Sequence, residues 1–125
     1  MSVRIASGID VIEIERIERA VARWGNRFLR RVYTEGEIAY CRGRAQNLAG
    51  RFAAKEAASK ALGVGIRTLS WRDVETIRGP RGKPQLRLHG KAARIAAELG
   101  LSGLEVSITH SRTDAIAVVV AWGDA

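Results

Sequence analysis

Three side chains recur every four residues in the stretch 50–63: Phe52, Glu56 and Lys60. In a helix this spacing places an aromatic ring, a carboxylate and an ammonium group one above another on one side. The simplest interpretation is an ion pair on a helix surface, because Glu four residues before Lys stabilises a helix by about 0.2–0.5 kcal/mol. The rest of the sequence decides between this interpretation and a role in chemistry.

A second carboxylate, Asp10, lies near the end of the stretch 2–12, whose imperfect alternation predicts a strand. An acidic side chain at a strand end is held in place and partly exposed, although Asp10 could equally cap the helix that follows. Gly8 in the same strand indicates a close approach of backbone or ligand. The Phe52, Glu56 and Lys60 line belongs to a helix predicted over 47–62, which is rich in Ala, Leu, Lys and Glu and ends at Gly63.

A helix predicted over 13–24 has two different faces. The apolar side chains at the i, i+3, i+7 and i+10 positions predict its core face: Ile14, Ile17, Val21 and Trp24. Three arginines gather on the opposite side: Arg16, Arg19 and Arg23. Such a basic ridge is usually only a solvated face, but the lack of acidic residues among the three arginines favours a docking surface.

The remaining segments predict a mixture of helices and antiparallel strands. Residues 27–33 form a helical turn, and Thr34 with Glu37 forms a capping box that opens a helix ending near Cys41. The patterns then predict a hairpin of strands 71–77 and 85–89, a helix over 91–99, and strands over 105–109 and 115–122, the last of them central. We therefore expect an α+β fold, with antiparallel sheet packed against helices, in a single domain spanning residues 1–125.

Composition limits the possible partners and the compartment. The chain carries 21 basic and 13 acidic residues, a net charge of +8, which attracts nucleic acid, anionic lipid, nucleotide phosphates or an acidic protein. The lone cysteine, Cys41, cannot form an internal disulfide and suits a small buried position. No signal-peptide pattern or membrane-spanning run is present, so we expect a cytoplasmic protein without a membrane partner.

Three sequence islands together resemble the holo-acyl-carrier-protein synthases, the small bacterial branch of the 4′-phosphopantetheinyl transferases. The islands are Gly8-Ile9-Asp10 with Arg16, the segment 51–57 with Lys60, and the segment 106–111. The resemblance covers almost the full chain and includes the Gly-Lys-Pro of the predicted hairpin at 82–84. It implies the phosphopantetheinyl transferase fold and transfer of a 4′-phosphopantetheine arm from coenzyme A to a serine of an acyl carrier protein, in fatty-acid or polyketide biosynthesis.

The resemblance also assigns roles to individual residues. Asp10 and Glu56 match the family's carboxylates for Mg²⁺, a cation that typically takes one or two protein carboxylates together with phosphates and water. Lys60 matches the family's helix lysine, which would stabilise charge on the phosphates. Either Glu56 or a water on the metal could deprotonate the carrier serine.

Further residues could meet the phosphates or the adenosine end of coenzyme A. His110 matches the family's Ser-Ile-Thr-His histidine, although a strand-end histidine bonded to backbone would explain it equally well. Arg51 and Lys55 could each meet a phosphate or only solvent. Gly63 and Gly65 would let the backbone approach the coenzyme, although a helix end already accounts for Gly63.

Carrier proteins of this kind are strongly acidic, so the basic ridge would steer and orient them. Its Arg16 matches a family arginine, and Arg19 and Arg23 extend the same face. By resemblance we expect a homotrimer with active sites between subunits. The competing interpretation is a small nucleic-acid-binding module, but the sequence shows no aromatic-basic stacking surface, zinc-ligand spacing or phosphate-binding Gly-Lys-Ser/Thr loop.

Overall fold

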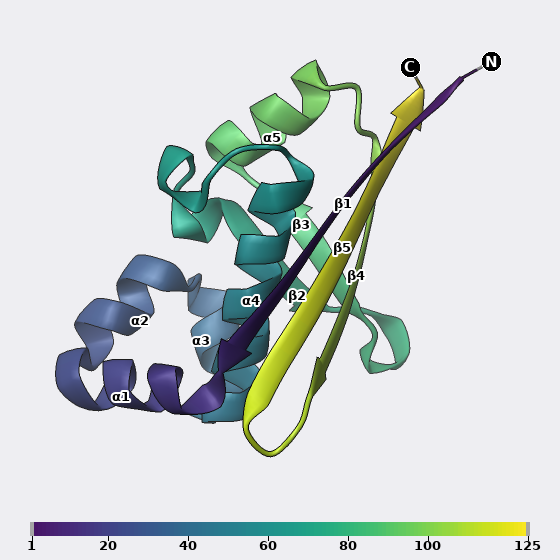
Figure 1. Ribbon diagram of the computed structural model, residues 1–125. Helices are drawn as coiled ribbons and strands as arrows, with labels where there is room; N and C mark the ends of the chain where they lie inside the picture. Colours follow the sequence, from purple (N-terminus) through teal and green to yellow (C-terminus); the bar gives the residue numbers. More distant parts are fainter. Residues whose placement is uncertain (1, 125) are drawn as a thin grey trace.

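The computed structural model describes residues 2–124. Its main sheet contains three antiparallel strands in the order β1-β5-β4: β1 (Val3–Glu13), β5 (Asp114–Asp124) and β4 (Gly103–His110). The apolar strand β5 lies in the centre, as predicted, and in Figure 1 the two chain ends meet at one end of β1 and β5. The register places Asp10, Ala117 and Ile108 side by side across the sheet.

Helix α4 (Ala45–Ala61) crosses the inner face of this sheet (Figure 1). Its contact with the sheet uses small residues, which allow a close approach. A Cβ atom at Gly8 would lie only 2.0 Å from the carbonyl oxygen of Ala57, and one at Gly50 would lie 2.8 Å from Ile108 Cγ2. Helix α4 therefore runs diagonally from β4 to β1, and Gly8 marks a close approach of backbone, one of the two alternatives that the sequence left open.

Three short helices stand at one end of α4: α1 (Ile14–Trp24), α2 (Asn26–Val32) and α3 (Glu35–Cys41). In α1, Ile14 and Ile17 are buried as predicted, but the core position predicted for Trp24 is wrong because its side chain is 49% exposed. The chain turns at Gly25, and the guanidinium groups of Arg23 and Arg27 lie over the Trp24 ring. The apolar stripe of α1 thus ends before its last turn.

Other local predictions hold, with one change. Thr34 and Glu37 form the capping box at the start of α3. The hairpin of β2 (Val74–Arg78) and β3 (Pro84–Leu88) is present, followed by α5 (Gly90–Glu98). The first strand begins later than predicted, because Trp71–Asp73 forms a 3₁₀ turn. The structure thus has the predicted α+β architecture, with helices and antiparallel strands.

The single cysteine and the membrane prediction can also be compared with the structure. Cys41 is fully buried, and burial raises the pKa of its thiol to about 11, so it is protonated at neutral pH and behaves as a small apolar group. Within residues 2–124 no helix has the length and apolar character needed to cross a membrane.

The outer face of the sheet is apolar and exposed. The side chains that point away from the helices on β1 and β5 include six large hydrophobic ones, each 37–71% exposed: Val3, Ile5, Ile9, Val11, Ile116 and Trp122. The register pairs Ile5 with Trp122 and Val11 with Ile116, so these side chains form one continuous strip along the two strands.

Candidate active site

The structure brings Asp10, Glu56 and Lys60 into one cluster where α4 crosses β1. The Lys60 Nζ donates a hydrogen bond to the Ile9 carbonyl oxygen at 2.9 Å and lies 3.4 Å from Asp10 Oδ1. Lys60 therefore pairs with the strand and not with Glu56 one turn earlier, so the interpretation as an ion pair within the helix is wrong. The Asp10 side chain is 18% exposed and that of Lys60 is 53% exposed, which leaves the cluster accessible.

Glu56 lies beside this pair, and its electrostatics show how close the two carboxylates are. Partial burial, followed by repulsion from Asp10, raises the pKa of the Glu56 carboxyl, while Lys60 opposes the shift. Two carboxylates that repel each other across a gap favour a bound cation between them.

The sequence places these groups through the packing of α4. Between residues 48 and 61 all side chains of α4 are buried except Phe52, Glu56 and Lys60. These three form the line recognised in the sequence, and Phe52 stacks on Trp71 with ring centroids 4.7 Å apart. The absence of a Cβ atom at Gly8 lets this part of the helix approach the strand that carries Asp10.

The donor set suits a hard divalent cation. Within residues 2–124 no group of three or more His, Cys, Asp or Glu side chains could hold a metal ion. Asp10 and Glu56 offer two partly exposed carboxylates, which is the number that Mg²⁺ accepts when phosphates and water supply its remaining ligands. The residues present therefore fit Mg²⁺ bound together with a phosphate-containing substrate.

A second group of basic side chains lines a pocket at the start of α4. The pocket is bounded by Tyr40, Arg51, Arg78 and His110, among others. The Arg51 guanidinium is 4.2 Å from the centre of the Tyr40 ring. Although Arg51 is only 7% exposed, its Nε has no hydrogen-bond partner among the described residues 2–124. A buried, unpaired donor beside two further basic groups suits an anion.

The other phosphate candidates have different surroundings. The exposed His110 contacts the Ser111 carbonyl oxygen through Nδ1 at 3.3 Å, which is the strand-end arrangement that the sequence left as its alternative role. Gly63 has φ of +75° just past the end of α4, so the helix end explains it. A Cβ atom at Gly65 would meet nothing within 4 Å.

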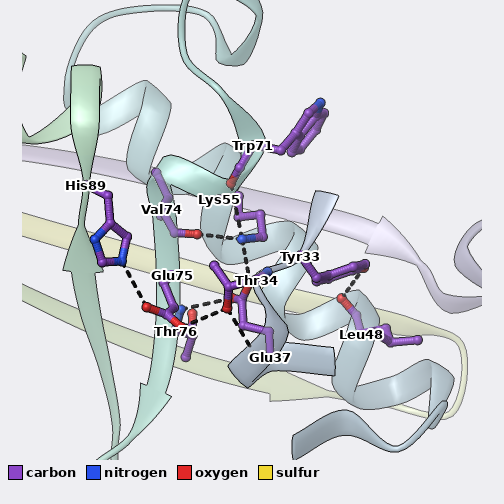
Figure 2. A network of polar contacts seen from close by, with 10 residues as sticks. All are labelled: Tyr33, Thr34, Glu37, Leu48, Lys55, Trp71, Val74, Glu75, Thr76 and His89. Atoms are coloured by element: carbon purple, nitrogen blue, oxygen red, sulfur yellow. Dashed lines mark hydrogen bonds and ion pairs between the residues drawn. The ribbon is translucent and has the colours of Figure 1, made fainter. Parts of the chain in front are cut away.

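The prediction that Lys55 meets a phosphate or solvent is wrong. Its side chain is fully buried, and its Nζ lies 2.7 Å from Glu37 Oε1 (Figure 2). Burial lowers the pKa of the Lys55 ammonium, and Glu37 acts against that shift. Lys55 lies on the same side of α4 as Leu48 and Leu62, so helical spacing indicates that it faces the core side of the helix. The spacing does not reveal the acceptors that allow its burial.

The cluster of Asp10, Glu56 and Lys60 and the basic pocket of Arg51 and His110 lie at opposite edges of the sheet. Asp10 lies on β1, whereas His110 lies on β4, two strands and roughly 10 Å away. Along α4, Arg51 precedes Lys60 by nine residues, or roughly 13 Å. One chain therefore carries two candidate binding regions at different edges of the sheet.

The arginines of the predicted ridge are exposed, and a groove that the sequence analysis missed extends their surface. Arg16, Arg19 and Arg23 are all exposed on α1. The groove beyond them is lined by Trp24, Arg27, Phe28 and Arg31. The signal lay in the two aromatic residues interspersed with arginines on either side of Gly25, so the expectation that the chain has no surface combining aromatic and basic side chains is wrong.

Comparison with known proteins places these features in a family. Residues 6–119 match the family model described as the 4′-phosphopantetheinyl transferase superfamily. A holo-[acyl-carrier-protein] synthase of Herpetosiphon aurantiacus is 52% identical, with 95% of this chain and 99% of that protein covered. One from Carboxydothermus hydrogenoformans is 43% identical, with 95% and 98% covered.

Solved structures agree with the sequence relatives. The Helicobacter pylori holo-[acyl-carrier-protein] synthase in complex with coenzyme A has a TM-score of 0.84 at 39% identity, with 92% of this chain and 98% of that chain covered. The Plasmodium yoelii acyl carrier protein synthase with ADP bound has a TM-score of 0.89 at 29% identity, and both chains are fully covered.

Proposed function

The chain belongs to the 4′-phosphopantetheinyl transferase superfamily, and from this premise we propose that it is a holo-acyl-carrier-protein synthase. It transfers the 4′-phosphopantetheine arm of coenzyme A to a serine of an apo acyl carrier protein. The serine oxygen forms a bond to the phosphorus that carries pantetheine, the diphosphate bond breaks, and adenosine 3′,5′-bisphosphate leaves. The observation that supports this most directly is the Asp10, Glu56 and Lys60 cluster, which suits a diphosphate and a cation.

Asp10 and Glu56 are the proposed ligands of Mg²⁺, which when bound would neutralise the diphosphate of coenzyme A. Lys60, held by the Ile9 carbonyl oxygen, directs its ammonium charge into the same space and stabilises the charge that develops on the leaving phosphate. Either the Glu56 carboxylate or a water on the metal would accept the serine proton.

The coenzyme site is completed between subunits of a homotrimer. The Arg51 and His110 pocket lies at the opposite sheet edge from the carboxylates, so a neighbouring chain can supply it to bind the remaining phosphate of coenzyme A. Gly63 and Gly65 would border the adenosine end. The exposed apolar strip on β1 and β5 supports this assembly, because association would bury it.

The carrier protein docks on the basic ridge of Arg16, Arg19 and Arg23, together with the Trp24 groove beside it. Removing ridge charges with Arg16→Ala or Arg23→Ala should slow carrier association most at low salt and leave coenzyme A binding unchanged. Arg94→Ala, an equal charge change on exposed α5, is the matched control. Unchanged carrier affinity at low salt in both ridge variants would exclude the ridge as the docking surface for the carrier protein.

The reaction is tested by mass spectrometry of apo carrier proteins incubated with coenzyme A and Mg²⁺. We expect the mass of each modified carrier to rise by one phosphopantetheine arm, and no transfer when a chelator removes the metal. Fatty-acid and polyketide carriers are tried in parallel. We propose that the protein acts in the cytoplasm. Salt-sensitive binding to duplex DNA without transfer would instead favour the nucleic-acid module.

The shared site is tested by mixing two inactive variants, Lys60→Met and Arg51→Gln. In mixed trimers each site takes one group from each of two chains, so co-refolding equal amounts should restore about one quarter of the sites. If activity does not return although mixed trimers form, both groups act within one chain and the shared site is wrong.

A further inference from the structure

The contact between α4 and the sheet does little to fix how the helix is rotated. Its sheet-facing residues are small, as at Gly50, Ala57 and Ala61, and the strands opposite present small residues such as Gly8 and Ala117. Interdigitating large side chains normally set the rotation of a helix, and such side chains are few here. Besides the hydrogen bond from Lys60 to Ile9 and the stacking of Phe52 on Trp71, the direction in which Glu56 points therefore depends on contacts on the far side of the helix.

The contact that can fix α4 is the buried side chain of Lys55, directly before Glu56. Its Nζ donates to Glu37 Oε1 at 2.7 Å, to the Trp71 carbonyl oxygen at 3.2 Å and to the Val74 carbonyl oxygen (Figure 2). The acceptors come from α3, from the 3₁₀ turn at 71–73 and from β2. Three acceptors on three segments define the position of one nitrogen in all directions.

Glu37 is fixed as firmly as Lys55. Its Oε1 also accepts the Thr34 backbone N–H at 3.0 Å, and its Oε2 accepts the Thr76 backbone N–H at 2.9 Å. Both charged side chains have an exposed fraction of 0%. Desolvation makes such a pair a weak source of stability, so a role in specifying one arrangement accounts better for a pair with every contact satisfied.

A small error in helix rotation would be enough to spoil the neighbouring carboxylate. Successive residues of a helix point about 100° apart, so any rotation of α4 about its axis moves Lys55 and Glu56 by the same angle. Fixing Lys55 on one side of the helix therefore fixes the direction of Glu56 on another. A turn of about 20° would move a side-chain tip roughly 5–6 Å from the axis by about 2 Å. That shift is as large as the length of a Mg²⁺–oxygen bond, so it would take the carboxylate out of reach of the cation.

We propose that the buried Glu37–Lys55 ion pair is a positioning device that holds α4 at the rotation where the Glu56 carboxylate faces Asp10. Lys55 and Glu37 are positioning residues, since neither reaches the site itself. This inference rests on the proposed function, because it assumes that the two carboxylates share a cation.

The test replaces the pair by neutral side chains and measures cation binding directly. In the double variant Lys55→Met/Glu37→Gln no buried charge remains unpaired, so it should be more stable than Lys55→Met alone. We expect its affinity for Mn²⁺ to fall about tenfold, which is the effect typical of mutating a residue that orients a metal ligand. The affinity is measured by titration with electron paramagnetic resonance, with coenzyme A present. The control Leu101→Ala removes buried volume between α5 and β4 and should lower stability without changing the affinity.

The outcomes separate the inference from the proposed function. If the wild-type protein binds no Mn²⁺ with coenzyme A, the proposed function fails. If the wild-type protein binds it and the folded double variant has the same affinity within twofold, the positioning role is wrong. Should the double variant not fold, Lys55→Arg replaces it, because an arginine keeps the positive charge beside Glu37 but its planar guanidinium does not reproduce the geometry of the lysine ammonium. This variant must bind Mn²⁺ more weakly than Leu101→Ala, and equal affinity overturns the inference.

Discussion

Helix α4 carries two lysine–carboxylate pairs with opposite surroundings. Lys55 and Glu37 lie 2.7 Å apart with both side chains fully buried, whereas Lys60 and Asp10 lie 3.4 Å apart with the lysine 53% exposed. The first pair has further hydrogen-bond partners in three segments of the chain, namely the start of α3, the 3₁₀ turn at 71–73 and β2. The second has one backbone acceptor and a neighbouring carboxylate, Glu56, that it does not neutralise.

The difference shows how one helix divides structure from function. In the buried pair each charge is compensated within the fold, so nothing is left for a ligand to satisfy. In the exposed cluster, partial burial and then repulsion from Asp10 raise the pKa of Glu56, and a bound cation would offset both effects. A lysine and a carboxylate therefore hold the fold in place on the buried side of α4, whereas the same residue types are available to bind a ligand on its exposed side.

The largest effect is expected when the same substitution is made separately at each lysine and the two single variants are compared. Lys55→Met leaves Glu37 charged and buried without its partner, so the free energy of unfolding should fall by about 3–5 kcal/mol. Lys60→Met should change it by less than about 1 kcal/mol, because that pair is exposed, while slowing transfer about 10²-fold through loss of charge stabilisation. Urea unfolding and steady-state kinetics on both variants measure the contrast. Equal losses of stability would mean that the two pairs are not different in kind.

The next effect concerns the close approach that the cluster needs. Gly8→Ala places a methyl group 2.0 Å from the Ala57 carbonyl oxygen and 2.8 Å from the Ala61 nitrogen, so β1 and α4 must separate. We expect a loss of about 1–3 kcal/mol in the free energy of unfolding, together with weaker Mn²⁺ binding as Asp10 moves from Glu56.

The matched control for stability is Gly65→Ala, where a Cβ atom has open space and φ is −75°. Its free energy of unfolding should stay the same or rise by up to about 1 kcal/mol. A Gly8→Ala protein that unfolds like the wild type would show that the helix and strand can part without consequence.

Much of this arrangement could be predicted from local patterns. The capping box at Thr34, the central position of β5 and the line of Phe52, Glu56 and Lys60 all follow from spacing and residue type, which short-range physics decides. The resemblance on Asp10 and Glu56 named two residues that the fold then placed together.

What could not be predicted depends on tertiary surroundings. Helical spacing gives the side of α4 on which Lys55 lies, but its burial requires Glu37 and the carbonyl groups of Trp71 and Val74, which come from three other segments. Trp24 fits the apolar stripe of α1 but emerges where Gly25 turns the chain. The wrong predictions thus arose where a side chain's partners lie far away in sequence or where an element ends.

The smallest predicted effect is a pH dependence confined to the open side of α4. Because the folded protein raises the pKa of Glu56, it holds a proton there at pH values where an unfolded chain has released it. Without metal, the Glu56 contribution to stability should therefore decline as pH rises from the ordinary carboxyl value through the raised pKa. The carboxylate must be unprotonated to bind a cation, so Mn²⁺ affinity should change in the opposite direction and weaken as pH falls through the same window. Unfolding and Mn²⁺ titrations between about pH 4.5 and 8 on the wild type and Glu56→Gln measure both slopes. Glu56→Gln should lose the stability slope that belongs to this carboxyl; if the slope is identical in the two proteins, burial and repulsion from Asp10 do not raise the pKa of Glu56.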